Sequence, residues 1–177
     1  MKHILSRLKI RTVLATMALA TALFAFSLAQ NQEKPKMKVE IWSVVACPFC
    51  YIGKRKFETA LAQFAHADQV EVVWKSFILN PDVQTDATRG YYESLAEAKG
   101  WSPEYARQAG SNVTRMAVGA GLHYNMDAAI MSNTMRARCL LQAAKAAGRG
   151  SELKEALLRA HFIEGLNVDD PLVRLAM

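Results

Sequence analysis

The chain has 177 residues, of which 51% are hydrophobic, and its 22 basic and 16 acidic side chains give a formal net charge of +6. This length is sufficient for one domain, and the sequence contains no internal repeat or low-complexity tract, which excludes a repeat array. The excess of basic side chains lies in the first segment of the chain, so the charge gives no indication of nucleic-acid binding.

Residues 1–29 have the pattern of a secretory signal peptide. A segment with four basic side chains precedes an apolar stretch over residues 13–26, and Ser27 and Ala29 place small side chains before a cleavage site. We therefore predict cleavage after Ala29 and export to the periplasm, which leaves 18 basic and 16 acidic residues, a net charge of +2. The alternative is an N-terminal membrane anchor with the domain facing the periplasm, because the uncharged stretch over residues 12–32 is long enough to cross a bilayer.

After a short polar linker at residues 30–36, the sequence predicts a strand, a helix and a second strand. Val, Ile and Trp side chains favour strands over residues 37–46 and 70–79. Apolar side chains at helical spacing predict a helix over residues 51–67 between them. We expect a parallel strand pair with a right-handed crossover, so that residues 37–79 form a β-α-β unit. The side chains expected to form the buried face of the helix are Phe57, Ala60, Leu61 and Phe64.

Residues 80–177 have helical character. Gly100 suits a helix C-terminus, and Ser102 followed by Pro103 suits the start of the next helix. The predicted helices run over residues 90–99, from 102 toward 119, over 132–147 and 151–164, and from 169 onward. The fold class is therefore α/β, with the strands confined to the first part of the domain.

The motif Cys47-Pro48-Phe49-Cys50 lies at the junction of the first strand and its helix. A thiol at the first turn of a helix is close to unpaired backbone N–H groups and to the positive end of the helix dipole, which favour the thiolate. We therefore expect Cys47 to be the nucleophile, with a lowered pKa. Cys50, one turn further on, is the expected resolving thiol that attacks a mixed disulfide on Cys47. Pro48 suits the first helical position, and Phe49 carries neither a donor nor a charge.

Two other interpretations of the motif stay open, a metal site and an inert local disulfide. A structural zinc ion needs four ligands, and the remaining cysteine and the histidines do not pair at ligand spacing. The strand-turn-helix context favours redox chemistry, which requires no metal and no cofactor. Cys139 falls on a helical segment and is expected to be a small buried hydrophobic residue.

The residues around the motif resemble the active-site segment of the FrnE-like branch of the DsbA family of thioredoxin-fold proteins. The resemblance covers residues 37–177. Its matching segments are residues 41–43, 47–58, 76–82, 133–134 and 157–165. It implies a thioredoxin-like fold in which residues 80–177 are a helical insert, and thiol–disulfide exchange in proteins with Cys47 and Cys50 as the redox pair. The implied partners are protein or peptide thiols and disulfides, with glutathione as a further candidate.

Three departures from the family pattern bear on these expectations. Members usually carry an acid after the Trp-Ser step, where it helps to move the proton of a buried resolving thiol, and this chain has Val44. They usually carry a His before an Arg near Asn133, where this chain has Arg138 and Cys139. The family domain also continues with two strands, a closing helix and a substrate-holding cis-proline loop, a role that none of the five prolines suits. We therefore expect a C-terminally truncated chain, of which residues 30–177 alone fold marginally and associate through open sheet edges.

Two other functions remain as alternatives. Kappa-class glutathione transferases and the related isomerases share the inserted fold by resemblance, but they have serine at the position that matches Cys47. An inactive truncated fragment is the other alternative.

Other titratable side chains near the motif are expected to have structural roles. Lys54, Arg55 and Lys56 are assigned to a solvated helix face, which is the usual position of such a charge run. His66 is expected to interact favourably with the C-terminus of the first helix. His161 lies beside an apolar residue on an amphipathic helix and is expected to pack there.

Overall fold

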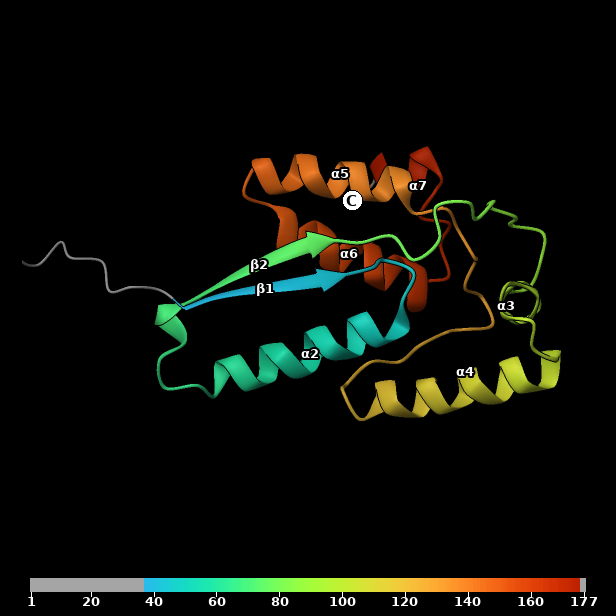
Figure 1. The fold of residues 1–177 in the computed structure, drawn as a ribbon, viewed down its shortest axis with the longest axis horizontal. Helices are drawn as coiled ribbons and strands as arrows, with labels where there is room; N and C mark the ends of the chain where they lie inside the picture. The colour runs from blue at the N-terminus through green and yellow to red at the C-terminus, as the bar shows by residue number, and fades with distance from the viewer. Residues whose placement is uncertain (1–36, 176–177) are drawn as a thin grey trace, which may run out of the picture. The chain divides into compact units, whose positions relative to one another are not determined.

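The structure is a computed structural model that describes residues 37–175. The predicted signal peptide (1–29) and linker (30–36) lie outside the described residues. The elements are β1 (Met37–Ser43), α2 (Pro48–Ala62), the 3-10 helix η1 (Ala67–Gln69), β2 (Val70–Ser76), α3 (Tyr91–Lys99), α4 (Pro103–Val118), α5 (Met135–Ala146), α6 (Gly150–Phe162) and α7 (Pro171–Leu175) (Figure 1). The predicted α/β class is confirmed, and each predicted strand and helix is present with adjusted bounds.

The first part of the domain is the β-α-β unit. β1 and β2 form a two-stranded sheet and run in the same direction, with α2 as their connection (Figure 1). Pairing continues past the end of β2, where the N–H of Phe77 donates to the carbonyl of Ser43 at 3.1 Å. β1 ends before the predicted position because the chain turns after Ser43, and α2 begins at Pro48 because proline fits the first helical position.

The helical part of the chain forms two pairs, α3 with α4 and α5 with α6. α3 ends at Gly100, whose φ of 65° lies in the left-handed region that glycine adopts without strain. α4 begins after Ser102, whose Oγ accepts a hydrogen bond from the N–H of Tyr105 at 3.2 Å. In Figure 1, α2 runs below the two strands, α5 runs above them and α6 lies behind.

The buried side chains gather in two clusters that the helices dominate. The first joins α2, α3, α4 and α6 around Tyr51, Leu158 and Phe162. The second joins α5 and α6 to Val45 in the turn after β1. β2 contributes no buried residue, and Ser43 is the buried residue of β1. The two strands therefore lie at the margin of the described core.

The predicted buried face of α2 is wrong. The buried residues of this helix are Tyr51, Ile52 and Lys54. Phe57 and Leu61 are only half-buried, and Ala60 and Phe64 are exposed. The reason is that α6 packs against the first half of α2, at Tyr51 and Lys54, whereas the sheet beside the helix has only two strands and offers little apolar surface.

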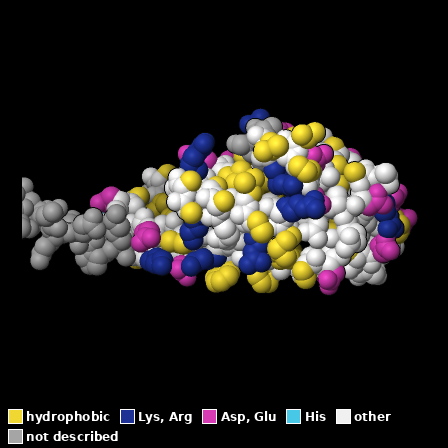
Figure 2. All heavy atoms as spheres, turned by 90° about the horizontal axis from the view of Figure 1, so that it is seen from above, with side chains coloured by type: hydrophobic (Ala, Val, Ile, Leu, Met, Phe, Trp, Pro, Cys, Tyr) yellow, Lys and Arg dark blue, Asp and Glu magenta, His cyan; other side chains and the backbone are white. Residues whose placement is uncertain are grey.

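The surface carries mixed charges on the side seen in Figure 2. Hydrophobic side chains lie among Lys and Arg there, and Asp and Glu lie mainly toward the edges, so this face has no continuous basic patch. Among residues 37–175, no helix combines the length and the apolar composition that crossing a membrane requires.

Candidate functional site

The Cys47–Cys50 motif forms the turn between β1 and α2, as predicted. Cys47 is the N-cap residue of α2, with extended backbone angles (φ −108°, ψ 114°), and Pro48 occupies the start of the helix. The N–H of Cys50 donates to the carbonyl of Cys47 at 3.0 Å and closes the first turn. This position places Cys47 beside the unpaired N–H groups of the helix start.

Both cysteines are free thiols of intermediate exposure. The N–H of Val44 donates to Sγ of Cys50 at 3.4 Å, and Val44 and Val45 are themselves buried. Cys50 is therefore held against the end of β1. Phe49, between the two cysteines, is 53% exposed and presents an apolar surface next to the pair.

The two thiols titrate as a pair. The hydrogen bond between their side chains has the largest effect: it lowers the pKa of Cys50 to about 5 and raises the pKa of Cys47. Burial raises both pKa values, the Val44 N–H and the charge of Lys154 lower that of Cys50, and the N–H groups of Cys50 and Phe49 lower that of Cys47. The sequence predicts a lowered pKa for Cys47, and the N–H groups at the helix start act in that direction, while the hydrogen bond to the neighbouring sulfur is the larger effect. When the pair has lost one proton, the two sulfurs share the proton that remains. The first proton therefore leaves easily and the second with difficulty.

Aromatic side chains support the turn from the side of the helical insert. Oη of Tyr124 donates to the carbonyl of Pro48 at 2.8 Å. The ring of Tyr124 stacks between Tyr51 and Phe162, with centroid distances of 6.1 and 5.1 Å. Tyr124 and Phe162 of α6 therefore hold the first turn of α2 in position.

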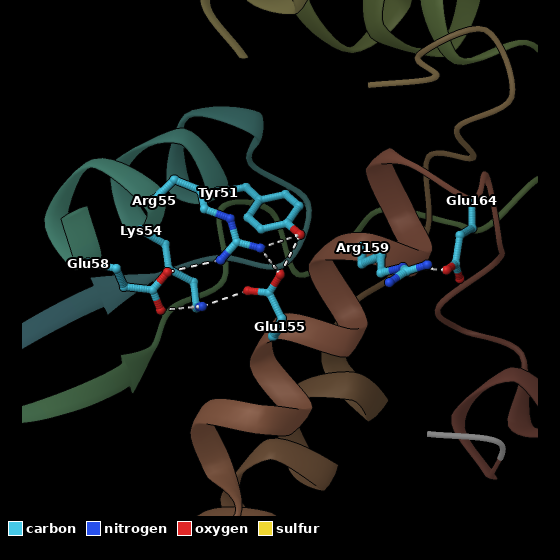
Figure 3. Close-up of polar contacts among 7 residues, drawn as sticks. All are labelled: Tyr51, Lys54, Arg55, Glu58, Glu155, Arg159 and Glu164. Carbon is cyan, nitrogen blue, oxygen red and sulfur yellow. Dashed lines mark hydrogen bonds and ion pairs between the residues drawn. The ribbon is translucent and has the colours of Figure 1, made fainter. Parts of the chain in front are cut away.

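A charged network joins α2 to α6 (Figure 3). Oε1 of Glu155 accepts hydrogen bonds from Tyr51, at 2.6 Å, and from Arg55. Oε2 of Glu155 pairs with Nζ of Lys54 at 2.6 Å, and Lys54 also pairs with Glu58 at 2.6 Å. Lys54 is 4% exposed, so its expected place on a solvated face is wrong, because its ammonium group pairs with Glu58 of α2 and Glu155 of α6. The network therefore holds α2 against α6.

Sequence reasoning missed Tyr124, Glu155 and Lys154. The first two act across long sequence separations, and no local pattern indicates them. Lys154 has a signal: it lies three, four and seven positions before Leu157, Leu158 and His161, on the apolar stripe of its helix. All four of these residues are buried.

Three further expectations concern the other cysteine and the histidines. Cys139 is exposed, so its predicted burial is wrong, because the buried side of α5 is formed by Ala137 and Leu141. α2 ends at Ala62, and His66 lies beyond it, at the start of η1, so it does not cap the helix. His161 is buried and packs edge-on against Phe162 at 4.5 Å, as predicted. In the described part of the chain, no three His, Cys, Asp or Glu residues gather in the manner of a metal site.

A β-α-β unit followed by helices, with two thiols at the head of its first helix, defines a thioredoxin-fold protein. The model of the DSBA-like thioredoxin domain matches residues 38–177, and the chain belongs to this family. The chain is also similar to the crystal structure of a probable DsbA oxidoreductase from Streptomyces coelicolor, with 36% sequence identity and a TM-score of 0.72. The match covers 79% of this chain and 60% of the length of that protein. No curated protein matches the sequence.

Proposed function

We propose that the chain is a thiol–disulfide oxidoreductase of the FrnE-like branch that exchanges disulfides with proteins through Cys47 and Cys50. The observation that carries the proposal is the pair of free thiols at the start of α2, with Cys47 as the N-cap residue and Sγ of Cys50 accepting a hydrogen bond from the N–H of Val44. The interaction of the two sulfurs lowers the pKa of one member of the pair. Such a pair holds a thiolate at neutral pH, and the thiolate is the species that attacks a disulfide.

In the reducing direction, the thiolate of Cys47 attacks one sulfur of a substrate disulfide, and the other substrate sulfur leaves as a thiolate. Cys50 then attacks Sγ of Cys47, releases the second substrate thiolate and closes the Cys47–Cys50 disulfide. Two electrons pass from the pair to the substrate, and the two protons of the pair end on the substrate thiols or in water. The oxidising direction is the same sequence in reverse.

The division of roles follows from the surroundings of each sulfur. Sγ of Cys50 is engaged by the N–H of Val44 at the end of β1. Cys47 is the N-cap residue, next to the exposed side chain of Phe49, where a substrate peptide can approach. Because the shared proton can rest on either sulfur, Cys47 attacks when that proton is on Cys50.

We further propose that the domain acts in the periplasm after removal of residues 1–29. An oxidising compartment allows the Cys47–Cys50 disulfide to persist between turnovers. Residues 37–79 and 80–177 then serve as the β-α-β unit and the helical insert of one thioredoxin-like domain, with protein thiols and disulfides as substrates.

Trapping of mixed disulfides tests the proposal. The variants carry Cys139→Ala, because that exposed thiol would otherwise form adducts of its own. Added to periplasmic protein extracts, Cys50→Ser should accumulate adducts that a reducing agent releases, since the attacking thiol remains and the resolving thiol is absent. Cys47→Ser should form few.

The reverse pattern, with adducts mainly on Cys47→Ser, would exchange the two roles. Equal and low adduct formation by both variants would contradict disulfide exchange by this chain. Peptide mapping of the adducts identifies the cysteine in each case.

A further inference from the structure

Lys154 is a buried cation for which residues 37–175 provide no paired carboxylate. It lies on α6 and is 3% exposed. The ion pairs of the described residues do not include it. Lys54, which is similarly buried, instead pairs with Glu58 and Glu155, each at 2.6 Å. Burial of an unpaired charge is unfavourable, so the position of Lys154 calls for a functional explanation.

The packing of α6 brings Lys154 to the redox pair. Leu153 and Leu157, on the same helix, belong to one buried cluster with Val45. Val45 adjoins Val44, whose N–H donates to Sγ of Cys50. The next residue on α6, Glu155, is bonded to Tyr51, which follows Cys50 on α2. The helix is therefore fixed against the motif on both sides of Lys154.

The ionisable groups around Lys154 come from α2, β2 and α5. Burial is the largest influence and lowers the pKa of Lys154 to about 8; negative charge on Cys50 and Cys47 acts to raise it, and Lys54 acts to lower it. The charged side chains of β2 and α5 that line the groove beside Lys154 are Glu71, Lys75 and Lys145. An amine of this kind changes its protonation state near neutral pH.

A groove beside Lys154 opens to solvent. The groove encloses about 310 Å³ between β2, α5 and α6, and Lys154 is part of its lining. Lys154 therefore has the sulfur of Cys50 within electrostatic reach and an open channel beside it, which is the arrangement that a proton carrier requires.

Building on the proposed disulfide exchange, we propose that Lys154 takes the proton of Cys50 in the mixed disulfide and passes it to solvent through this groove. When Cys47 is bonded to a substrate, it no longer donates a hydrogen bond to Cys50, which is the main interaction that favours the Cys50 thiolate. The Val44 N–H and the Ser43 hydroxyl still favour the thiolate, but neither can take its proton; Lys154 can, and it becomes a cation beside the thiolate when it does.

The step balances as a proton transfer followed by an exchange. The neutral amine of Lys154 takes the proton of the Cys50 thiol, giving an ammonium group and a thiolate. The thiolate attacks Sγ of Cys47, the bond between Cys47 and the substrate breaks, and the substrate leaves as a thiolate. The ammonium group then releases its proton to water in the groove.

The test uses a chain in which Cys50 is the sole thiol, Cys47→Ala with Cys139→Ala, so that no exchange activity is needed. The pH dependence of its alkylation by iodoacetamide reports the ionisation of Cys50. Lys154→Met should raise the apparent pKa of Cys50 by about one unit and slow alkylation several-fold near neutral pH. Lys154→Arg keeps the charge but cannot act as a base, so in this equilibrium measurement, which reports the effect of the charge, it should stay within about twofold of the parent.

Lys56→Met is the matched control, since it removes one exposed positive charge from α2 and should leave the profile unchanged. An unchanged profile in Lys154→Met would overturn the proposal. So would an equal loss in Lys154→Met and Lys154→Arg, which would indicate a packing effect. If the chain with both cysteines did not exchange disulfides, the proposed function would be contradicted. The alkylation result would still stand, because that measurement requires no exchange.

A reciprocal measurement keeps Lys154 in place and does not depend on the folding of its variants. Because the coupling of two charges is mutual, Cys50→Ala should lower the pH at which the side chain of Lys154 titrates in NMR. The same titration midpoint with and without Cys50 would count against the proposal.

Discussion

Tyr124 donates a hydrogen bond to the main-chain oxygen of Pro48 at 2.8 Å, although the two residues are 76 positions apart. The donor lies in the loop after α4, and the acceptor is the first residue of α2. This bond ties the helical insert to the turn that carries both cysteines.

Tyr124→Phe should lower the stability of the domain by about 1 kcal/mol, because it removes one partly buried hydrogen bond and keeps the stacked ring. Chemical denaturation measures the change. Tyr105→Phe is the control: Tyr105 is 54% exposed, and within the described residues its hydroxyl makes no hydrogen bond. A similar loss in both variants would show that the bond to Pro48 is not responsible.

Glu155→Gln should destabilise the domain by about 2 kcal/mol, because it leaves the buried ammonium group of Lys54 with one carboxylate where it has two. Equilibrium unfolding in urea measures this. Glu164→Gln is a matched control, since Glu164 forms an exposed pair with Arg159 at 2.7 Å (Figure 3). It should change the stability by less than about 0.5 kcal/mol.

The same carboxylate predicts an acid-dependent loss of stability. Burial acts to raise the pKa of Glu155, but the hydrogen bonds from Lys54 and Tyr51 outweigh it and leave the pKa below 4.5, the ordinary value. Its contribution is therefore present above pH 4.5 and is lost as the pH falls through the lowered folded-state value. Unfolding curves in this range should converge for the parent chain and Glu155→Gln. Curves that stay equally far apart would contradict the assignment.

Gly110→Ala should destabilise the pair of α3 and α4 by about 2 kcal/mol, although alanine favours a helix. The added Cβ would overlap the ring of Tyr92, which is buried and has little room to move. Gly53→Ala, on α2, meets no atom within 4 Å and should raise the stability by about 0.5 to 1 kcal/mol. Thermal melts compare the two, and a stabilising effect of Gly110→Ala would refute the close contact.

His161 predicts a second pH effect. The side chain is fully buried, and burial lowers its pKa from 6.5 to about 4. Between these pH values the unfolded chain binds a proton that the folded chain does not, so stability should fall by up to about 3 kcal/mol as the pH is lowered. His161→Leu should remove this slope, whereas His123→Gln, at an exposed position, should keep it. A slope that persists in His161→Leu belongs to another group.

The local elements and the position of the two cysteines could be predicted from the sequence, because they depend on short-range patterns. Pro48 fixes the start of α2, Ser102 caps α4, and Gly100 ends α3, and each of these effects acts within one helical turn. The position of the motif at the start of a helix therefore follows from local sequence signals.

The tertiary structure alone decided which side chains surround that motif. Lys54 meets Glu155 across 101 positions, and its place on a buried face depends on where α6 lies. The sharing of one proton by Cys47 and Cys50 depends on the closeness of the two sulfurs and on the hydrogen bond that the N–H of Val44 donates to Cys50. Periodicity specifies that a helix has an apolar face but not which partner covers it, and electrostatic coupling falls off over a few ångströms, so these features follow only from the packed fold.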